Sequence, residues 1–562
     1  MEHDLHSSTK ASPTNVSQAQ AGFVLGTYSA VAAGVLTFVI LLWLRQKFGK
    51  NQTLPPGPRG LPLLGYLPFL EKNLHVKLRD LSGEYGPVFG LKVGAANIVV
   101  LNDFESIKEG LCKKELLSRL QNVARHAGVD GMTTLNGKRW SDNRKFALHM
   151  LRDAGLGKKA AEEHVMKESR QLLERISDTG GAALNVQEYV LPSTSNNVAA
   201  LVFGSGLPYD DPRRKRLDYV LSEAVAALAG GSFVTVLPAL LDRMAGRLPF
   251  TRLGTIRRSL RQLLDFISTQ VEEHLASGDE EKDRDFINGY LEKIKEHQDD
   301  PNPSFNMEHL VGTVLNFFGA GSNTVALSIH WHMLNCAKNA DTVQSRIQKE
   351  IDDVVGSERR PTWADRTRMP FTMAAIWEMY RWKTISPLGI PRGATDDTHI
   401  RGFFIPKGTV VIANLWAVHM DPKLWTKPDE FDPRRFMDEE GRGILAKPEY
   451  LIPFSIGVVY QVNCVDCDAT YIGETGRRRS TRLKEQRRDV VKATHATRSK
   501  SELVDHSWTT AHTFDLDNAA TLAREQRWGP RNFVESWFIR RDLKACNTNR
   551  DPLPDVYGDL LD

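Results

Sequence analysis

The segments Glu378-Met379-Tyr380-Arg381 and Phe431-Asp432-Pro433-Arg434-Arg435-Phe436 say most about how this chain folds. Residues three apart on a helix lie on one face, so Glu378 and Arg381 can pair there. On its own, such a pair is routine on a helix surface. The second segment offers Arg435 as a further cation. Together the two segments predict a network of three charged side chains that ties a helix to a distant loop.

Two upstream patterns predict a site for a large group. Trp140-Ser141-Asp142-Asn143-Arg144 puts an indole donor and a cation on one helical face, which suits an anionic group such as a propionate. Most such pairs, however, are surface cation–π contacts. Gly319-Ala320-Gly321-Ser322-Asn323-Thr324 lies within an apolar helical segment. Small residues there lower helix propensity, which favours either a bulky group beside Thr324 or close packing of two helices.

The periodicity of residues 70–450 predicts a mainly α-helical fold with small β-sheets. Short β-like runs occur at 88–93 and 97–101, and the stretch 402–413 is typical of a hairpin around Pro406-Lys407-Gly408. Apolar residues recur at the helical period over the segments 162–177, 256–276, 308–338, 341–355 and 370–382.

Composition excludes some classes of protein. The chain has 562 residues and a formal net charge of only +4, so its bulk charge does not require a polyanionic partner. Five cysteines in this length exclude a disulfide-stapled fold and favour a reducing compartment.

The N-terminal region predicts a membrane anchor. Residues 21–44 are strongly apolar, and a helix of that length spans about 36 Å, enough for a ~30 Å hydrocarbon core. A cleavable signal peptide is the alternative, but no basic stretch precedes this long run. Because Arg45 and Lys47 follow it, residues 1–20 are expected in the lumen and the bulk of the chain in the cytosol. A basic, proline-rich hinge at 45–62 would act as a stiff spacer.

The order and spacing of these motifs resemble the cytochrome P-450 family, with its proline-rich hinge and its W-x-x-x-R, A-G-x-x-T, E-x-x-R and P-x-R-F motifs. Asp285-Phe286-Ile287 and Pro391-Arg392 are similar to animal microsomal members. The resemblance covers residues 1–457 and implies a cytochrome P-450 fold over 63–457. It also implies a haem-dependent monooxygenase, held by a single-pass anchor in the lipid of the endoplasmic reticulum membrane. Such an enzyme inserts one oxygen atom of dioxygen into a small lipophilic substrate, with electrons from an NADPH-dependent cytochrome reductase.

The resemblance implies roles for individual residues as well. The haem propionates would be bound by Trp140, Arg144 and Arg392. The structural triad behind the haem would be Glu378, Arg381 and Arg435. Thr324 would help to deliver protons to iron-bound dioxygen, and its neighbour Asn323 stands where many relatives carry an acid.

The family pattern breaks in the loop that should hold the haem iron, F-x-x-G-x-R-x-C-x-G. Phe454-Ser455-Ile456-Gly457 is in register, but Val459 replaces the arginine and Gln461 replaces the cysteine. A neutral amide is a poor substitute for a thiolate, whose electron donation favours O–O cleavage. The nearest cysteine, Cys464, comes later and lies beside Asp466. The fold is therefore expected to be C-terminally truncated, without its haem cysteine and its last helix.

Residues 458–562 resemble a second family, the GIY-YIG nucleases carried by some retroelements, which implies a small α/β tail. By position, Tyr460 and Tyr471 would activate water and Arg482 would stabilise charge on the scissile phosphate. Glu535 would hold a divalent metal, and nucleic acid would be the partner. The first triplet of the motif lacks its own glycine.

The tail also contains the ligand set of a tetrahedral structural zinc site, two thiolates and two imidazoles. These residues are Cys464, Cys467, His506 and His512. The alternative is an accidental cysteine pair and two surface histidines.

Three hypotheses remain at this point. The chain is a monooxygenase impaired by the interrupted cysteine loop, a nucleic-acid-acting module joined to an oxidase body, or a non-catalytic chimera from a mobile-element insertion or a mis-joined gene model. The motifs through residue 457 favour the first hypothesis as the family of the chain. The missing cysteine favours the third hypothesis as a description of its actual chemistry. A membrane anchor disfavours the second, because a reticulum protein rarely meets DNA.

Overall fold

A computed structural model describes most of the chain between residues 53 and 455 and short pieces elsewhere. The chain divides into two compact units, Met1–Thr53 and Leu54–Asp562. Within the predicted anchor at 21–44, only Gly34 and Thr37 are described, and both are helical. The described residues are 34, 37, 53–62, 64–70, 73–94, 96–116, 118–119, 129–153, 159–228, 246–248, 251–277, 285–445, 447–455, 458–463, 470–475 and 520–523.

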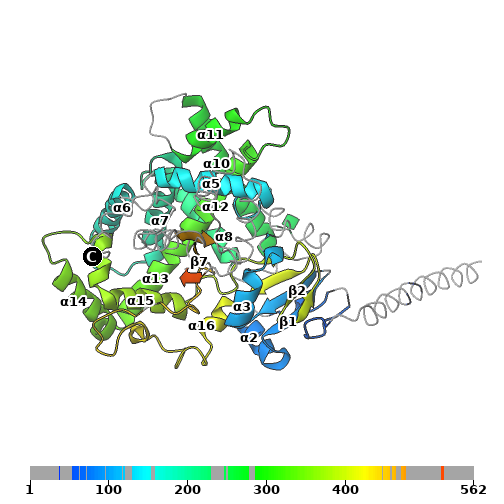
Figure 1. Ribbon diagram of the computed structural model, residues 1–562. Coiled ribbons are helices and arrows are strands. Elements are labelled where there is room, and N and C mark those ends of the chain that lie inside the picture. Colours follow the sequence, from blue (N-terminus) through cyan, green and yellow to red (C-terminus); the bar gives the residue numbers. More distant parts are fainter. Residues whose placement is uncertain are drawn as a thin grey trace, which may run out of the picture. The chain divides into compact units, whose positions relative to one another are not determined.

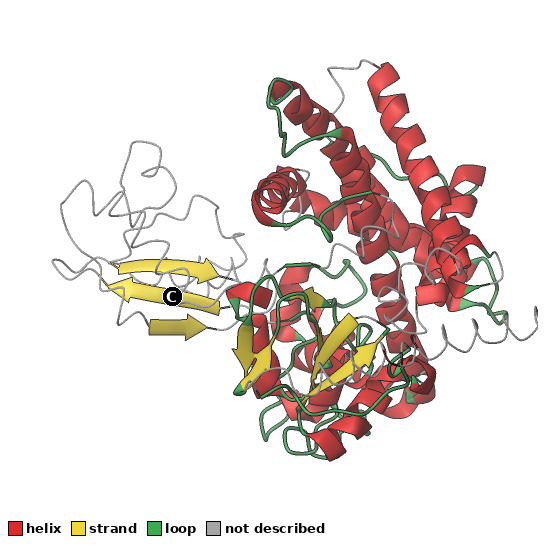
Figure 2. Ribbon diagram, turned by 90° about the vertical axis from the view of Figure 1, so that its right-hand side faces the viewer, coloured by secondary structure: helices red, strands yellow, loops and turns green. Residues whose placement is uncertain are grey.

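The second unit is mainly helical with small sheets, as the periodicity predicts (Figures 1 and 2). The segments expected at 162–177, 256–276 and 370–382 are confirmed by α6, α10 and α15. Its described α-helices are α2 (Leu74–Tyr85), α3 (Phe104–Leu111), α5 (Gly137–Asp153), α6 (Lys159–Ser177), α7 (Val186–Phe203), α8 (Pro212–Leu228), α10 (Arg252–Ser277), α11 (Phe286–Glu296), α12 (Met307–Gly321), α13 (Asn323–Lys338), α14 (Ser345–Val354), α15 (Pro370–Trp382) and α16 (Leu415–His419).

Short turns of other helix types join these elements. A π-helical turn, η4 (Ala340–Gln344), precedes α14, and together they replace the single helix expected at 341–355. The described 3-10 turns are η1 (Leu67–Phe69), η2 (Lys114–Leu116), η5 (Trp363–Arg368) and η6 (Pro433–Phe436).

A four-stranded sheet, in the order β1-β2-β6-β3, lies beside the helices. β1 (Val88–Val93) pairs antiparallel with β2 (Ala96–Leu101), which confirms the two strands expected there. β6 (Val410–Ala413) runs parallel to β2 and antiparallel to β3 (Arg392–Gly393).

The hairpin predicted over 402–413 is wrong. β5 (Phe403–Ile405) turns back on β4 (Thr398–Ile400) in a separate two-stranded sheet, and β6 joins the larger sheet. The physical reason is burial, because all four residues of β6 are buried and need cover that a free hairpin does not provide.

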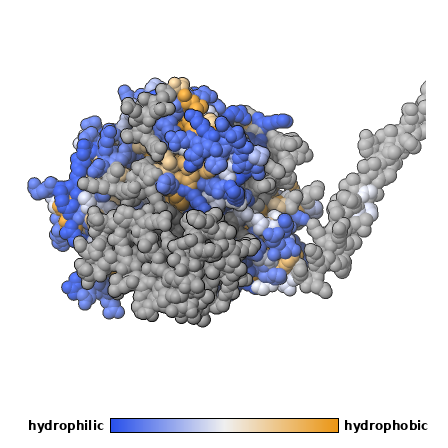
Figure 3. Space-filling model, turned by 45° about the horizontal axis from the view of Figure 1, so that its top comes forward, coloured by the Kyte–Doolittle hydropathy of each residue, from blue (hydrophilic) through white to orange (hydrophobic). Residues whose placement is uncertain are grey.

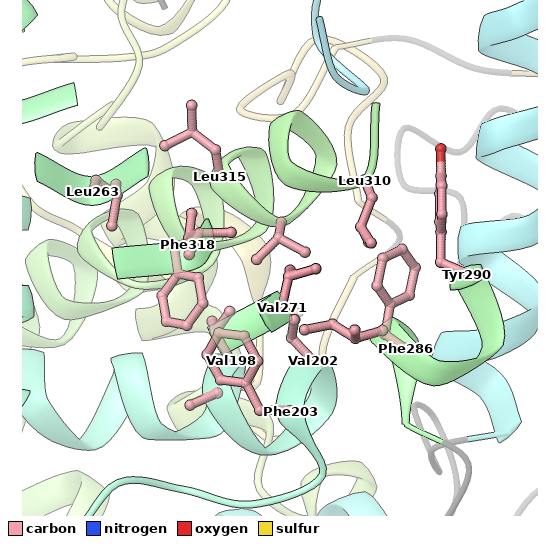
Figure 4. Close-up of a cluster of buried hydrophobic side chains, with 14 of the residues drawn as sticks. Val198, Val202, Phe203, Leu263, Val271, Phe286, Tyr290, Leu310, Leu315 and Phe318 are labelled. Atoms are coloured by element: carbon pink, nitrogen blue, oxygen red, sulfur yellow. The ribbon is translucent and has the colours of Figure 1, made fainter. Parts of the chain in front are cut away.

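The largest apolar core lies among α5, α7, α8, α10, α11 and α12 (Figure 4). Phe146 of α5 contacts the rings of Phe286, Tyr290 and Phe305 with centroid separations of 5.3–5.7 Å. On the face drawn in Figure 3, hydrophilic residues predominate over the described surface. A further core cluster packs around Val99, Ile107 and Val418, beside the four-stranded sheet.

The helix expected at 308–338 is broken once, at Ser322. α12 ends at Gly321 and α13 starts at Asn323, and the ψ angle of Ser322 is −69°. Glycines on either side of Ala320 weaken helix propensity at this point. Among the described residues, only the span Met307–Lys338 is long and apolar enough to cross a membrane, but half of its most apolar window is buried inside the protein, as in the core helix of a globular domain.

Three strands of the tail form an antiparallel sheet in the order β8-β7-β9 (Figure 2). β7 (Val458–Asn463) lies between β8 (Thr470–Thr475) and β9 (Ala520–Ala523). The chain therefore enters a sheet directly after the body.

Two glycines of α12 provide a test of this packing. A Cβ atom on Gly312 would lie 2.1 Å from the Asp130 carbonyl oxygen, whereas one on Gly319 would meet no atom within 4 Å. We expect Gly312→Ala to lower the free energy of unfolding by about 1–3 kcal/mol, because backbone cannot move aside easily. Gly319→Ala, the matched control, should be neutral or stabilise by up to about 1 kcal/mol.

Denaturant unfolding monitored by circular dichroism measures both changes. Equal loss of stability in the two variants would contradict the close approach of residues 130–131 to α12.

Candidate functional site

A buried carboxylate organises the part of the helical unit around α15. Glu378 is fully buried on this helix and receives two hydrogen bonds of 2.7 Å from Arg381, which is also fully buried. Arg435, on η6, donates to the same carboxylate at 3.2 Å. The backbone N–H of Asp432 adds a further bond of 2.9 Å. The segments 378–381 and 431–436 are thus joined through the side chain of Glu378.

The remaining donors of the two arginines hold the loop before η6. Arg381 donates to the carbonyl oxygens of His419, Pro428 and Glu430 at 2.8–3.0 Å. Arg435 donates to the carbonyl oxygen of Lys427 at 2.8 Å. A buried ion pair is stabilising only when its leftover donors are satisfied, and this one satisfies that condition.

His419 connects this network to the end of the body. Its ring is fully buried, and its Nε2 accepts a bond of 3.0 Å from the N–H of Ile452. The proton of the neutral ring therefore lies on Nδ1, which is 2.7 Å from the hydroxyl of Thr384. Burial, with Arg381 and Lys447 adding positive charge, lowers the pKa of His419 to about 3. The ring fixes the chain two residues before Phe454.

Three guanidinium groups meet where α5, β3 and the segment after η2 converge. Arg144 lies over the ring of Trp140 at 5.3 Å. Arg119 is held by Asn136, just before α5, and donates to the carbonyl oxygen of Ile390 at 3.2 Å. Its neighbour Ser118 accepts a bond from Gly393, next to Arg392.

This cluster of cations is suited to an anion. Burial, with the charges of Arg392 and Arg144, lowers the pKa of Arg119 to about 9. Burial also lowers the pKa of Arg392. Cations that disfavour one another in a partly dry site favour an anionic ligand such as a carboxylate. Sequence reasoning missed Arg119, since an arginine in an irregular segment carries no periodic signal. Its bonds to Asn136 and Ile390 and the bridge between Ser118 and Gly393 place it here.

The small-residue segment of α12 and α13 packs closely against another helix at one glycine and is open at another. Gly321 packs against α7, where a Cβ atom would lie 2.8 Å from Val198. Gly319 faces open space, and Ala320 at the end of α12 and Thr324 at the start of α13 are exposed. The Thr324 hydroxyl donates to the Ala320 carbonyl oxygen at 2.5 Å.

Asn323 faces away from that open space. Its side chain is buried and donates to the carbonyl oxygen of Leu221 on α8 at 3.2 Å. Among the described residues, its Oδ1 atom has no hydrogen-bond partner. Asn323 and Thr324 are adjacent in sequence, yet one belongs to a helix interface and the other to an open face.

The described residues fit the propionate groups of a haem and not its iron. The cations of residues 119, 144 and 392 suit its propionates. At the position where a thiolate is expected, the described chain has Gln461, which lies in β7 and is paired with Ile472 and Ala520 in neighbouring strands. The cysteines described, Cys112 and Cys336, lie at the end of α3 and in α13. Within the described part of the chain, no group of three His, Cys, Asp or Glu side chains is arranged to hold a metal ion.

The comparisons with known proteins agree with this architecture. A family model described as cytochrome P450 matches residues 55–459. The chain belongs to the cytochrome P450 family. The match ends inside β7, close to the point where the cysteine loop departs from the family pattern.

Individual cytochromes P450 are similar over most of their length. The chain is 36% identical to "Cytochrome P450 2G1" of Oryctolagus cuniculus over 75% of this chain and 84% of that protein. It is 36% identical to "Cytochrome P450 2F3" of Capra hircus over 76% and 87%, and 34% identical to "Cytochrome P450 2J3" of Rattus norvegicus over 75% and 84%. Membership of this family implies a haem-dependent monooxygenase.

Several predicted site residues of the tail lie outside the described part of the chain. Tyr460 and Tyr471 are described, in the paired strands β7 and β8. The residues that are not described are Cys464, Cys467, Arg482, His506, His512 and Glu535.

The buried ion pair gives a first prediction for this site. Arg381→Met leaves Glu378 with one cation and strands a buried charge, so we expect a loss of about 3–5 kcal/mol in the free energy of unfolding. The matched control is Arg434→Met, which removes an arginine that is 76% exposed and pairs with Asp432 at 2.8 Å. That exposed pair should contribute less than about 1 kcal/mol. Similar losses in both variants, measured by denaturant unfolding, would rule out the central role of Glu378.

The buried imidazole gives a second prediction. The pKa of His419 is lowered from 6.5 to about 3 in the folded chain, so only the unfolded state takes up a proton as the pH falls below 6.5. Stability is therefore present above pH 6.5 and is lost on acidification, by up to about 1.4 kcal/mol per pH unit. His419→Gln should reduce this slope between pH 6.5 and about 5, whereas His399→Gln, which removes an exposed ring, should keep it. A slope unchanged by His419→Gln in urea titrations would disprove the linkage.

Proposed function

We propose that residues 63–457 form the body of a membrane-anchored, haem-dependent monooxygenase whose activity is impaired by the interrupted cysteine loop. The substrate class is a small lipophilic organic compound, and electrons would come from an NADPH-dependent cytochrome reductase. The observation that carries the proposal is the combination of an intact cation cluster and a strand in place of the thiolate loop. The endoplasmic reticulum membrane, with one anchor at 21–44, is the proposed location.

Each group of residues in the chain would have its own role. Arg119, Arg144 and Arg392 would neutralise the two carboxylates of the haem, with Trp140 as a further donor. Thr324 would hold a proton at its Oγ1, next to the open space beside Gly319. Glu378 with its two arginines would keep α15 and η6 in place.

The limiting feature is the ligand to iron. A haem thiolate supplies electron density that favours O–O cleavage. In this chain β7 is paired on both edges where the cysteine loop would be, so restoring one side chain does not restore the loop. Loss of the chemistry therefore follows from the local backbone as much as from Gln461.

Carbon monoxide spectroscopy of the reduced full chain tests the impairment. We expect no Soret band typical of a thiolate-ligated haem, either in the native chain or in Gln461→Cys. Replacing residues 458–562 with the corresponding end of "Cytochrome P450 2G1" should restore the band, because the cation cluster and Thr324 remain. A thiolate band from the native chain would overturn the claim of impairment.

Two alternatives concern the tail. The first is a GIY-YIG-like, nucleic-acid-acting module, which the pairing of β7 with β8 favours because it joins the strands that carry Tyr460 and Tyr471. In that pairing Tyr460 is opposite Gly473 and Tyr471 is opposite Val462. Metal-dependent nicking by the isolated segment 458–562, abolished by Tyr460→Phe and by Arg482→Ala, is the expected result for such a module. Nicking that survives both changes would reject it.

The other alternative is a non-catalytic chimera, produced by a mobile-element insertion or a mis-joined gene model. The change of pattern between Gly457 and Val458 supports it. Sequencing the transcript across codons 455–462 tests it, because a continuation into R-x-C-x-G would identify a mis-joined gene model. A transcript that encodes Val458 onward would establish the junction as real.

A further inference from the structure

A cavity lies between the end of α6, the first half of α7 and the start of α8, and its lining includes none of Arg119, Arg144, Arg392 and Thr324. Its volume is about 590 Å³, within the range of small-molecule sites. Its walls combine aromatic and apolar side chains with cations. These residues include Arg175, Leu191, Tyr209, Arg214, Lys215 and Tyr219.

One arginine of the cavity is committed to the fold. Arg214 is 2% exposed, pairs with Asp218 at 3.2 Å and donates to the carbonyl oxygens of Leu207 and Pro192. Its guanidinium carbon also lies 4.3 Å from the centre of the Tyr209 ring. Arg214 thus builds the floor of the cavity and has little capacity left for a ligand.

Arg175 is in a different position. Its guanidinium carbon lies 4.5 Å from the ring centre of Tyr209 and 4.9 Å from that of Tyr189. The hydrogen bond that it donates to the Tyr189 carbonyl oxygen is long, at 3.5 Å. In the part of the chain that the structure describes, no carboxylate lies within ion-pair distance of Arg175 or of Lys215 on the rim. The aromatic rings therefore orient a cation whose donors are mostly unused by the described residues.

The acidic residues of the cavity offset only some of its cations. Asp218 accepts from Arg214 and from the hydroxyl of Ser195, and its charge reaches Arg175 only at longer range. Glu188 is exposed and accepts from the side chain of Asn185 at 2.8 Å. The cavity therefore has two available cations, one exposed carboxylate and an apolar wall.

We propose that this cavity is a second ligand site, separate from the haem site, that binds an aromatic carboxylate. Arg175 receives the carboxylate in charge-assisted hydrogen bonds, because a planar guanidinium matches its two oxygens. Tyr209 and Tyr219 contact the aromatic body, and Lys215 adds attraction at the rim. The site depends on α6, α7 and α8 and the segment between α7 and α8, so it requires neither haem nor a cysteine loop.

Equilibrium dialysis of 2-naphthoate against the full chain in lipid nanodiscs tests the proposal, with empty nanodiscs as the blank. We expect saturable binding at one site, weakened about tenfold or more by Arg175→Gln. Arg170→Gln is the matched control, because Arg170 is an exposed arginine of α6 that does not line the cavity. Circular dichroism checks that each variant is folded.

Further measurements separate the contribution of the carboxylate to the affinity from that of the aromatic ring. 2-Naphthalenemethanol, which has the same ring and no charge, should bind at least about tenfold more weakly. Inorganic sulfate at equal concentration should not displace 2-naphthoate. If Arg175→Gln fails to fold, Arg175→Lys keeps the charge without the planar fork and should still weaken binding. Unchanged binding in the folded Arg175 variant, equal binding of the neutral alcohol, or displacement by sulfate would each overturn the proposal.

Discussion

The carboxylate of Glu378 is the point on which the region around α15 depends. It lies fully buried and is neutralised by Arg381 and Arg435, whose other donors hold the carbonyl groups of the loop before η6. A lone buried charge would be strongly destabilising, so the three residues must stay together. Because separating the three residues would cost free energy of folding, α15, the loop before η6 and η6 form a single structural unit.

His419 extends that structural unit to the last part of the body. Its carbonyl oxygen accepts from Arg381, and its ring accepts from the N–H of Ile452. The chain is consequently held in place up to the residues just before Phe454. Beyond them it pairs as β7, which contains Gln461.

The cation cluster beside α5 and the cavity beside α6, α7 and α8 illustrate two uses of arginine. At the first, Arg119, Arg144 and Arg392 gather where the pKa of Arg119 is lowered, a sign of cations set close together in a partly dry place. In the cavity, Arg214 donates its hydrogen bonds to groups of the protein itself, whereas Arg175 is oriented by tyrosine rings that accept none of its hydrogen bonds. Which arginines can serve a ligand is decided by the acceptors around each one.

Much of this molecule follows from local sequence pattern. Helical periodicity locates α6, α10 and α15, alternation locates β1 and β2, and the spacing of Glu378 and Arg381 indicates an ion pair, because each of these signals depends on residues close in the chain. The partner of β6, the inclusion of Arg119 among the cations and the burial of Asn323 against α8 depend on residues far apart in sequence. Burial and strand pairing choose among such distant partners, and no local pattern records that choice.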